Sequence, residues 1–517
     1  MTTRAIAGAA GLLLATAPGA WALTAEQVWQ DWQDYYAGLG ATLTAEADTD
    51  DDRLTLTGLT VGMTMGEVGS VTRYEGEIDL VEQPDGSVRV ELPETLRMVI
   101  ETELPETDED MPEPGPVVML LDAAGAEIVG REAEDDPEGR VWTMTAERVT
   151  TTLEDVTQGQ GARAVPLEMV FTGIDTTYRS GPGAGGIEME QEGTAEGLTL
   201  SFEVDDVAQL DPEAAADADA ANDAPSGSLA LAYTASGLEY AGGGLMASDG
   251  KVGAMGLRQG SRFDMTFAHA GSETTLSGRS PEGDFSVEGL SASASGRIAL
   301  TDAGSIIEEV ASEGVEMTAR VPQFPVPLTF SAGRMGGGFE MPFFVTGESA
   351  PAGLLLELRE LTIDDMLWGL FDPTGQLPRD PATVVLDVDG AATLLVDLFS
   401  GDPAAIEAMD GPPGELEQLT VSELLVEAVG ARLAGSGRLD FPTPDPSRPV
   451  GTLDLTLSGG FALMDRLVAL GFLPAEQAGF VKGMAGAVAE STGEDELSTT
   501  IEFSETGSIT AGGLPLR

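Results

Sequence analysis

The sequence predicts a mainly β, α+β fold: a long, curved antiparallel β-sheet with an N-terminal helix and a C-terminal helical hairpin packed on it. Three observations predict this fold. Apolar and polar residues alternate through most of the chain, which is the period of half-buried strands. Turn-forming clusters separate these runs, without the strand–helix–strand alternation of a parallel sheet. Helical spacing of apolar residues is found near the N-terminus and in the last third.

The first 22 residues have the pattern of a secretory signal peptide. Arg4 precedes the uncharged stretch 5–17, and Ala20-Trp21-Ala22 supplies the small-x-small pattern of a signal-peptidase site. We expect cleavage between Ala22 and Leu23, and therefore an exported, periplasmic protein. No cysteine adjoins the junction, so a lipoprotein is not expected.

A helix is expected to open the mature protein. Thr24 and Gln27 have the spacing of a capping box, and Gly38 and Gly40 follow as a stop signal. Between them a stripe of large side chains recurs at helical spacing: Val28, Trp32, Tyr35, Tyr36 and Leu39. The stripe predicts a helix that packs on a core, with stacking on a ligand as the alternative.

From residue 41 to 204 the pattern predicts antiparallel strands. One alternating run consists of Leu54, Leu56, Leu59, Val61 and Met63. The segment Pro-Asp-Gly at 84–86 predicts a hairpin turn, and Pro-Glu-Gly at 137–139 predicts another turn. Residues 101–115 are expected to form an acidic, proline-bearing loop between strands.

Composition divides the chain. Residues 205–228 are rich in Ala and Asp and hold few large apolar side chains, so they are expected to be a linker or loop. Strand patterns resume at Leu229 as a β-meander. The expected regions are a signal peptide at 1–22, a helix plus antiparallel strands at 23–204, the linker at 205–228, the β-meander at 229–350 and a mixed α/β region at 351–517.

The last third predicts both helices and strands. Leu361–Phe371 and Ala391–Phe399 have helical patterns, and the extended run Ala382–Val388 lies between them. Leu419–Leu439 returns to strand character. A helical hairpin and a final strand pair are expected to close the chain: Phe461–Leu470 with Pro474–Ala489, and Leu497–Phe503 with Ser508–Leu514.

The charge balance excludes several classes of partner. The chain holds 88 Asp and Glu against 25 Lys and Arg, a net charge of −63. Such a surface repels phosphate, so we expect no nucleic-acid partner, and it repels anionic lipid headgroups unless divalent ions bridge the two. The simplest explanation of the acidity is that it keeps the protein soluble in salty surroundings. The 42% hydrophobic content is enough for a substantial core.

Two further kinds of feature are missing from the sequence. The chain has no cysteine, which excludes a disulfide, a thiol nucleophile and a cysteine metal site. The most apolar stretch after the leader, Leu467–Pro474, is far shorter than the roughly 20 residues of a membrane-spanning helix. No transmembrane span is therefore expected in the mature chain.

Several motif-like patterns are explained better by structure than by chemistry. His269, the single histidine, shares the parity of Phe263, Met265 and Phe267, so we expect a structural residue on the apolar face of a strand. Gly181, Gly183 and Gly186 have dinucleotide-binding spacing, but a strand pattern follows them and a turn is expected. Ser248 and Lys251 have the SxxK spacing, but Asp249-Gly250 between them predicts a hairpin turn.

Acidic residues leave two kinds of site open. The clusters at 48–52, 106–110 and 132–136 could bind calcium weakly, although a solvated loop is the simpler explanation. A carboxylate pair for glycoside hydrolysis cannot be selected from 88 acidic residues by pattern alone. The sequence therefore assigns no catalytic residue and no cofactor, and it leaves metal binding unknown.

Three segments resemble one bacterial family. They are LTAEQVWQDWQDYYAGLG at 23–40, FDPTGQLPRDPATVVLDVDGAA at 371–392 and SITAGGLPLR at 508–517. They look like the alphaproteobacterial exported family called domain of unknown function 2125, and the likeness is expected to run through most of the mature chain. The family has no established activity, so the resemblance implies export and overall architecture and transfers no catalytic residue. The closing segment also resembles the ends of AsmA-like envelope proteins, which implies a long β-sheet with an apolar groove that handles lipids.

Together these patterns predict a periplasmic, non-enzymatic envelope protein. Its apolar sheet face is expected to bind lipid acyl chains or another envelope protein. Two alternatives stay open: a carboxylate-based hydrolase of an envelope glycan, and a structural or adhesive surface protein stabilised by calcium.

Overall fold

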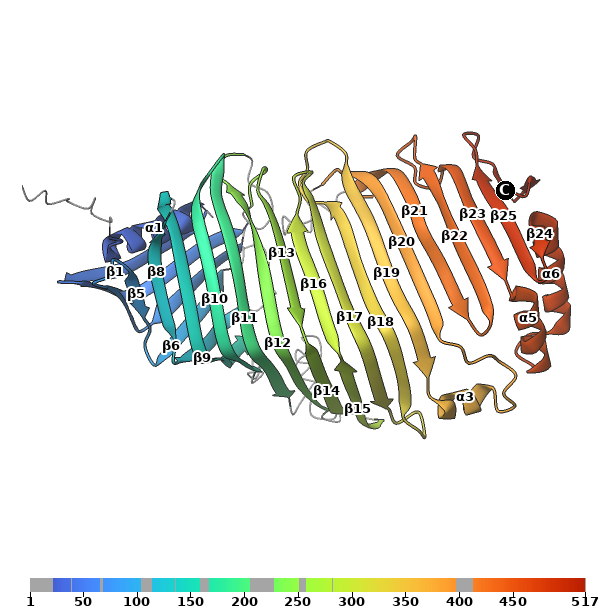
Figure 1. Ribbon diagram of the computed structural model, residues 1–517, viewed down its shortest axis with the longest axis horizontal. Coiled ribbons are helices and arrows are strands. Elements are labelled where there is room, and N and C mark those ends of the chain that lie inside the picture. The colour runs from blue at the N-terminus through green and yellow to red at the C-terminus, as the bar shows by residue number, and fades with distance from the viewer. Residues whose placement is uncertain are drawn as a thin grey trace, which may run out of the picture.

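The structure is a computed structural model that describes residues 22–38, 40–65, 68–103, 114–134, 136–158, 167–204, 227–250, 257–280, 282–396 and 412–516. Its 27 strands belong to one sheet. Figure 1 shows an elongated molecule in which the strands lie side by side across the long axis, with the N-terminal strands at one end and the C-terminal helices at the other. The predicted mainly β fold with helices at both ends is confirmed.

The N-terminal part of the sheet follows one helix. The elements are α1 (Ala25–Gly38), β1 (Thr42–Asp50), β2 (Arg53–Met65), β3 (Val68–Glu75), β4 (Glu77–Glu82), β5 (Val88–Glu91), β6 (Thr95–Glu103), β7 (Pro114–Ala124), β8 (Glu127–Ala133) and β9 (Asp136–Gln158).

The middle of the sheet consists of longer strands and their split neighbours. These are β10 (Leu167–Gly183), β11 (Gly186–Val204), β12 (Ser228–Ala247), β13 (Arg262–His269), β14 (Gly271–Ser280), β15 (Gly283–Ser291), β16 (Ser293–Leu300), β17 (Ser305–Arg320), β18 (Leu328–Pro342) and β19 (Ala350–Ile363). Strand β11 pairs with β12 along its whole length, so the sheet is continuous on both sides of the expected linker, of which 205–226 lies outside the described residues.

The C-terminal part contains the remaining helices. Its elements are α3 (Asp365–Phe371), β20 (Ala382–Leu394), β21 (Gly414–Ala428), β22 (Ala431–Asp440), β23 (Val450–Ser458), α5 (Gly460–Ala469), α6 (Ala475–Val488), β24 (Glu490–Gly493), β25 (Glu496–Phe503), β26 (Ile509–Ala511) and β27 (Leu514–Pro515). The predicted helical hairpin and final strand pair are present.

Helix α1 begins with the expected capping box. The backbone N–H of Thr24 donates to the Gln27 side chain at 2.9 Å, and the backbone N–H of Gln27 donates to the Thr24 hydroxyl at 3.2 Å. Two N–H groups that the helix itself leaves without partners are satisfied in this way.

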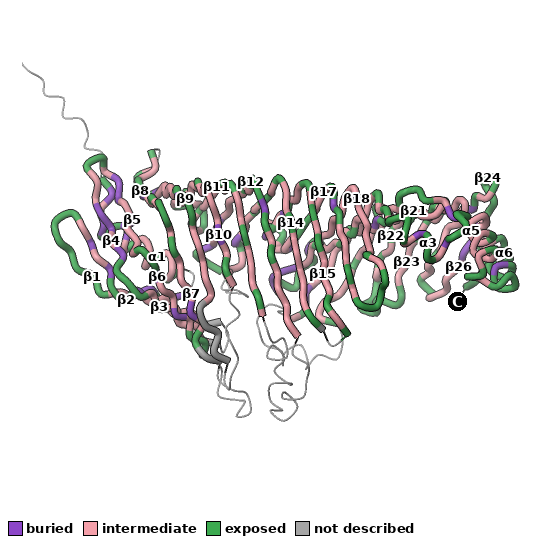
Figure 2. The backbone as a smooth tube through the Cα atoms, turned by 90° about the horizontal axis from the view of Figure 1, so that it is seen from below, coloured by how far each residue is buried: buried purple, intermediate pink, exposed green. Residues whose placement is uncertain are grey.

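The same helix covers one end of the sheet and builds its most buried core. Val28 is fully buried, together with Leu56 and Leu80 of strands β2 and β4. The rings of Trp32 and Trp142 lie 6.1 Å apart between centroids, which joins the helix to β9. Figure 2 shows buried residues gathered in this N-terminal part, whereas the middle strands are mostly intermediate or exposed. The apolar stripe of the helix therefore packs on a core.

A line of backbone kinks, which we call the crease, crosses the sheet from β2 to β19. On five strands it passes through a residue in the left-handed conformation: Gly58 (φ 64°), Gly173 (φ 59°), Gly237 (φ 58°), Gly314 (φ 58°) and Glu360 (φ 56°). The ladders skip the pairs at these positions, for example between Gly237 and its opposite residue Glu196. Glycine adopts this conformation without steric cost, and irregularities of this kind bend a sheet.

Each kink shifts the apolar pattern by one residue. In β12, apolar side chains occupy odd-numbered positions before Gly237 and even-numbered positions after it: Leu231, Tyr233 and Ala235, and then Leu238 and Tyr240. A regular strand would turn one of these two sets to the opposite face, because its side chains alternate. The left-handed residue cancels the shift, so one face of the sheet stays apolar on both sides of the crease.

Some predicted elements differ from the structure. Residues 137–139 lie at the start of strand β9, and the chain turns earlier, where Ala133 pairs with Asp136. Ala391–Leu394 continue strand β20, so the predicted helix at Ala391–Phe399 is wrong there, and 397–399 lie outside the described residues. The ladder pairs of β20 with β19 and β21 explain the difference, because sheet pairing overrides a weak local helical pattern.

The helix predicted at Leu361–Phe371 is shorter than expected. Its first residues complete strand β19, and α3 begins after Asp364, whose carboxylate accepts the Met366 backbone N–H at 2.6 Å. This N-cap fixes the start of the helix. The central part of the predicted acidic loop at 101–115 lies outside the described residues.

Candidate functional site: an apolar face of the sheet

One face of the sheet is lined by apolar side chains across the middle and C-terminal strands, and we call it the apolar face. Residues directly opposite each other in antiparallel ladders project to the same side. A continuous row of such partners crosses eight strands: Tyr240, Phe267, Gly296, Val310, Gly337, Leu356, Leu386 and Leu424.

Large side chains of the apolar face are open to solvent. Eight of them have between 37% and 50% of their surface exposed. They are Phe267, Ile298, Val310, Phe339, Leu354, Leu356, Val384 and Val426. The main helix contacts with the sheet lie near its ends, α1 on β1, β2 and β4, α5 on β22 and α6 on β24. Extended exposed apolar surface of this kind marks an interaction site.

A hollow of about 580 Å³ lies on the apolar face along the crease. Phe171, Leu198 and Tyr233 line it on one side of the crease, and Ile174, Leu238 and Phe267 line it on the other. The lining comes from β10, β11, β12, β13, β16 and β17, which are successive neighbours in the sheet. Five spacings between six strands give a length of about 24 Å.

Aromatic rings lie flat over glycines in this part of the sheet. A Cβ atom on Gly296 would lie 2.0 Å from Phe267 Cζ, and one on Gly193 would lie 2.5 Å from Tyr240 Cε1. Each ring therefore occupies the space that the side chain of its cross-strand partner would fill. The rings thus extend the apolar surface over positions where the partner strand has no side chain.

A polar pair interrupts the wall of the hollow. The Tyr233 hydroxyl and His269 Nε2 lie 3.3 Å apart, and His269 Nδ1 has no hydrogen-bond partner among the described residues. His269 is half-buried on the apolar face, as its parity predicted. Tyr233 and His269 therefore offer hydrogen bonds within a mainly apolar lining, which also includes Thr176 and Ser312.

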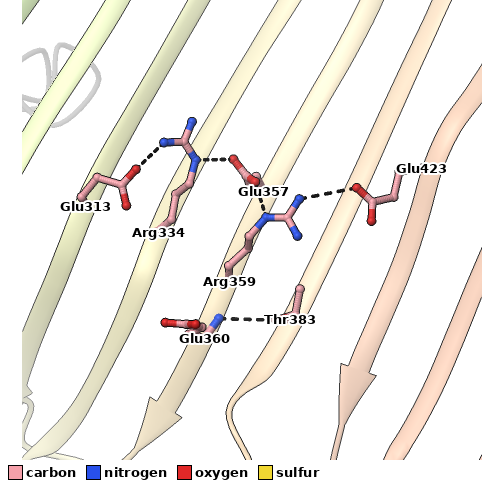
Figure 3. A network of polar contacts seen from close by, with 7 residues as sticks. All are labelled: Glu313, Arg334, Glu357, Arg359, Glu360, Thr383 and Glu423. Atoms are coloured by element: carbon pink, nitrogen blue, oxygen red, sulfur yellow. Dashed lines mark hydrogen bonds and ion pairs between the residues drawn. The ribbon is translucent and has the colours of Figure 1, made fainter.

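The opposite face carries ladders of ion pairs, and we call it the charged face. Figure 3 shows one network that joins Glu313, Arg334, Glu357, Arg359 and Glu423 across strands β17 to β21. The Arg334 guanidinium lies 2.5 Å from Glu357, and Arg359 lies 3.4 Å from Glu423. Both arginines are engaged by carboxylates, so this network offers no unpaired cation for an anionic ligand.

Excess carboxylates on the charged face repel one another. Burial, and then the charge of Asp389, raises the pKa of Glu340. Burial, Asp389 and Glu423 raise the pKa of Asp387. Burial acts in the same direction on Glu357, but hydrogen bonds from Arg359 and Arg334 outweigh it and lower the pKa of that carboxyl.

A second, more open hollow of about 850 Å³ lies on the charged face. Its side chains include Asp175, Glu192 and Glu239 together with Arg297. The Arg297 guanidinium is held by Asp264, with contacts of 2.7 and 2.9 Å. The raised-pKa residues Glu340 and Asp387 line neither hollow, so neither hollow places these two carboxyl groups around a glycan.

Two of the three glycines with dinucleotide-binding spacing lie at a turn, and the third, Gly181, pairs with Glu188 within β10. Gly183 and Gly186 close the hairpin between β10 and β11, which confirms the predicted turn. Ser248 follows β12 with its hydroxyl donating to the Gly185 carbonyl at 3.2 Å, and Lys251 lies outside the described residues. Among the described residues no group of three or more Asp, Glu, His or Cys is placed to hold a metal ion, and the cluster at 106–110 is not part of them.

The expected cleavage pair lies beside the N-terminal hairpin. Leu23 is 1% exposed, and its backbone N–H donates to the Gly86 carbonyl at 3.1 Å. Ala22 is exposed. Cleavage between them stays a prediction. A new amino group on Leu23 would keep the same acceptor, because an ammonium also donates hydrogen bonds.

Sequence reasoning anticipated an apolar sheet face but did not identify its residues. The signal that could have identified these residues is the change in apolar alternation at the crease. Alternation changes phase at Gly58, Gly173, Gly237 and Gly314, and these glycines mark the positions where two apolar sets must join on one face.

Comparison with known families gives one match. The family model described as an uncharacterized protein conserved in bacteria (DUF2125) matches residues 347–517, which confirms the resemblance for two of the three segments. The segment 23–40 and all residues that line the apolar hollow precede the matched range. No curated protein matches the chain, and no solved structure matches it. No described helix of the chain is long and apolar enough to span a bilayer.

Proposed function

We propose that this chain is an exported, periplasmic protein that binds lipid acyl chains on the apolar face of its sheet. The observation that carries the proposal is the set of eight exposed large apolar side chains on the apolar face, from Phe267 to Val426, on a chain of net charge −63. A soluble protein seldom exposes so extended an apolar surface without a ligand or partner for it. The leader pattern of residues 1–22 supports export.

The dimensions of the hollow suit an acyl chain. Its length of about 24 Å exceeds the depth of one bilayer leaflet, about 15 Å, which is half of the hydrocarbon thickness. Its volume of about 580 Å³ is in the range of small-molecule pockets. Ring faces over Gly193 and Gly296 offer flat apolar contact along this length. A lipid headgroup would extend to solvent, where the acidic surface favours a neutral or zwitterionic group.

Binding on the apolar face requires no catalytic group. The face supplies area and shape, and the Tyr233–His269 pair supplies hydrogen bonds to an ester or carboxyl group near the end of a chain. Burial of one methylene group contributes about 0.8 kcal/mol, so even a partly covered acyl chain would be held with useful affinity.

The test measures lipid uptake by the purified chain. Lipid that co-purifies is identified by mass spectrometry, and uptake from phosphatidylcholine vesicles is followed with a fluorescent fatty-acyl lipid. Ile298→Asp places a carboxylate on the apolar face at a 39% exposed position, and we expect uptake to fall at least about tenfold, which is about 1.4 kcal/mol.

Thr266→Asp is the matched control, because Thr266 is exposed on the neighbouring strand β13, projects to the charged face and does not line the apolar hollow. It adds the same charge and should leave uptake close to that of the unchanged chain. Absence of uptake by the unchanged chain, or equal effects of the two variants, would refute lipid binding on this face. The second outcome would point to a nonspecific charge effect.

A further inference from the structure

The far end of the molecule carries a second apolar surface, on the helical hairpin 459–489, which we call the tip. Figure 1 shows α5 and α6 of the tip at the end of the sheet, beyond β25. Phe472 in the connecting turn and three residues of α6 are exposed: Phe480, Val481 and Met484. Phe480 is 68% exposed, more than any other large apolar side chain among the described residues.

The tip differs in charge from the rest of the chain. It contains two acidic residues, Asp465 and Glu476, and two basic residues, Arg466 and Lys482, so its net charge is zero while that of the whole chain is −63. The Lys482 ammonium lies 2.7 Å from Asp465 and 5.5 Å from the centre of the Phe461 ring. Its charge is therefore engaged within the hairpin, and the outer side of α6 presents few charges.

The tip is fixed to the end of the apolar face. Asp495 accepts the backbone N–H groups of Phe461 and Ala462, both at 2.9 Å, and so caps the start of α5. A Cβ on Gly460 would lie 2.7 Å from Leu457 Cδ2, and Leu457 shares a row with Leu433 and Leu497. The apolar surface of the sheet thus leads to the helix that carries the tip.

We propose that the tip docks on a lipid membrane, with Phe472, Phe480, Val481 and Met484 inserted at the level of the headgroups. The inference rests on the proposed function, because it names the lipid surface from which the apolar face would be loaded. An exposed apolar helix face with adjoining aromatic side chains is the surface that binds the interfacial layer of a bilayer. Because the tip has no net charge, it does not itself experience the repulsion that anionic headgroups exert on the rest of the chain.

A second copy of the chain is the other partner that the apolar surface of the tip could bind. It would bring a second whole chain of net charge −63 close to the first, and repulsion between two such chains disfavours association. A zwitterionic surface brings no such charge. The charge distribution therefore favours a membrane.

The experiment is flotation of the full chain with vesicles of phosphatidylcholine. We expect the unchanged chain to float with the vesicles. Phe480→Glu should lower the bound fraction on the order of tenfold, because the insertion of apolar side chains supplies the binding. Ala475→Glu is the control: it adds the same charge at an exposed position on another side of α6, in its first turn, where a negative charge is compatible with the helix.

Phe472→Glu, in the turn between the helices, is a second variant with the same expected loss, and circular dichroism of each variant verifies that it folds. Vesicles with anionic lipid should bind less of the unchanged chain than neutral vesicles, and added salt should reduce the difference. Preference for anionic vesicles would contradict the inference.

The outcomes separate this inference from the proposed function. Ile298→Asp should float with vesicles as the unchanged chain does while it loses lipid uptake. A chain that takes up no lipid but floats in a Phe480-dependent way would refute the proposed function and support membrane docking. No flotation of the unchanged chain, equal flotation of Phe480→Glu, or a concentration-dependent dimer that Phe480→Glu abolishes without any vesicle binding would each overturn membrane docking.

Discussion

At the residue scale, contacts between aromatic rings and glycines shape the apolar face. Phe267 lies over Gly296, and Tyr240 lies over Gly193. Gly193 and Gly296 have ordinary φ angles, so a glycine is needed there only to leave room for the ring. Gly237 and Gly314 are needed for their left-handed backbone conformation. The same residue type therefore has two roles in neighbouring strands, and a substitution should act differently at each.

Gly296→Ala tests the spatial role. The new Cβ would lie 2.0 Å from Phe267 Cζ, so the ring must move away from its place on the strand. We expect a loss of about 1–3 kcal/mol in the free energy of unfolding, as for other overpacked sites, measured by urea denaturation. Gly479→Ala is the control, because nothing lies within 4 Å of its Cβ position in helix α6, and alanine favours a helix there. Equal unfolding curves for Gly296→Ala and the unchanged chain would contradict the account.

At the scale of elements, long strands and end helices were predictable because their patterns are strong and local. The capping box of Thr24 and Gln27 and the Pro474 start of α6 gave two helices correctly. The helix predicted at Ala391–Phe399 was wrong, since pairing with β19 and β21 extends β20 to Leu394. The crease could not be predicted as a whole, because it depends on the alignment of kinks in strands far apart in sequence.

The candidate site was predictable as a class of surface only. Alternation indicated an apolar face, but whether that face is covered depends on where helices pack, which local pattern does not determine. His269 was placed on the correct face from its parity with Phe267. Its neighbour Tyr233 comes from a strand 36 positions earlier, and nothing local joins the two.

Asp495→Ala tests how the tip is attached. The side chain caps α5 through two N–H groups, and the residue has φ 54°. Loss of the cap and the strain of alanine in the left-handed region should together remove about 2 kcal/mol. Hydrogen exchange in residues 460–469 should accelerate. Asp495→Asn keeps an oxygen acceptor and tolerates the backbone angle, so exchange as fast as in the alanine variant would argue against capping.

At the scale of the whole molecule, repulsion among negative charges is the main electrostatic effect that destabilises the fold. The net charge of −63 is distributed along an elongated sheet, and self-repulsion opposes the compact state. Arginine ladders on the charged face offset part of it, as in the network around Arg334. Repulsion between carboxylates persists around Asp387 and Glu340, and the pKa values of both residues are raised.

Stability should depend on pH with a maximum in mildly acidic solution. Glu340 and Asp387 have a raised pKa in the folded state, so the fold gains stability as pH falls and they bind protons before the unfolded chain does. Asp264 and Glu357 have a lowered pKa, so the stability they contribute above their unfolded pKa is lost at lower pH. We expect the melting temperature to rise from pH 7 toward about 5 and to fall below about 4.

Asp389→Asn tests how much repulsion among Glu340, Asp387 and Asp389 contributes to the pH dependence. Burial is the larger cause of both raised pKa values, so removing this charge should lower each pKa in part. It should increase the melting temperature at pH 7, with a smaller gain on acidification. Asp48→Asn removes the same charge from an exposed position at the other end of the molecule. Calorimetry that finds the two variants alike would show that total charge, rather than the cluster, sets the pH dependence.

The crease also has a consequence for how such a molecule can change in length. Each hairpin that crosses it repeats the same cross-section, because the left-handed residues of β10, β12, β17 and β19 have nearly the same φ. Inserting one more hairpin with a glycine at the matching position would lengthen the sheet and its apolar hollow by about 10 Å while keeping the same kink. The distance that the sheet spans between its N-terminal end and the tip could thus change in steps of one hairpin, without a change in what either end contacts.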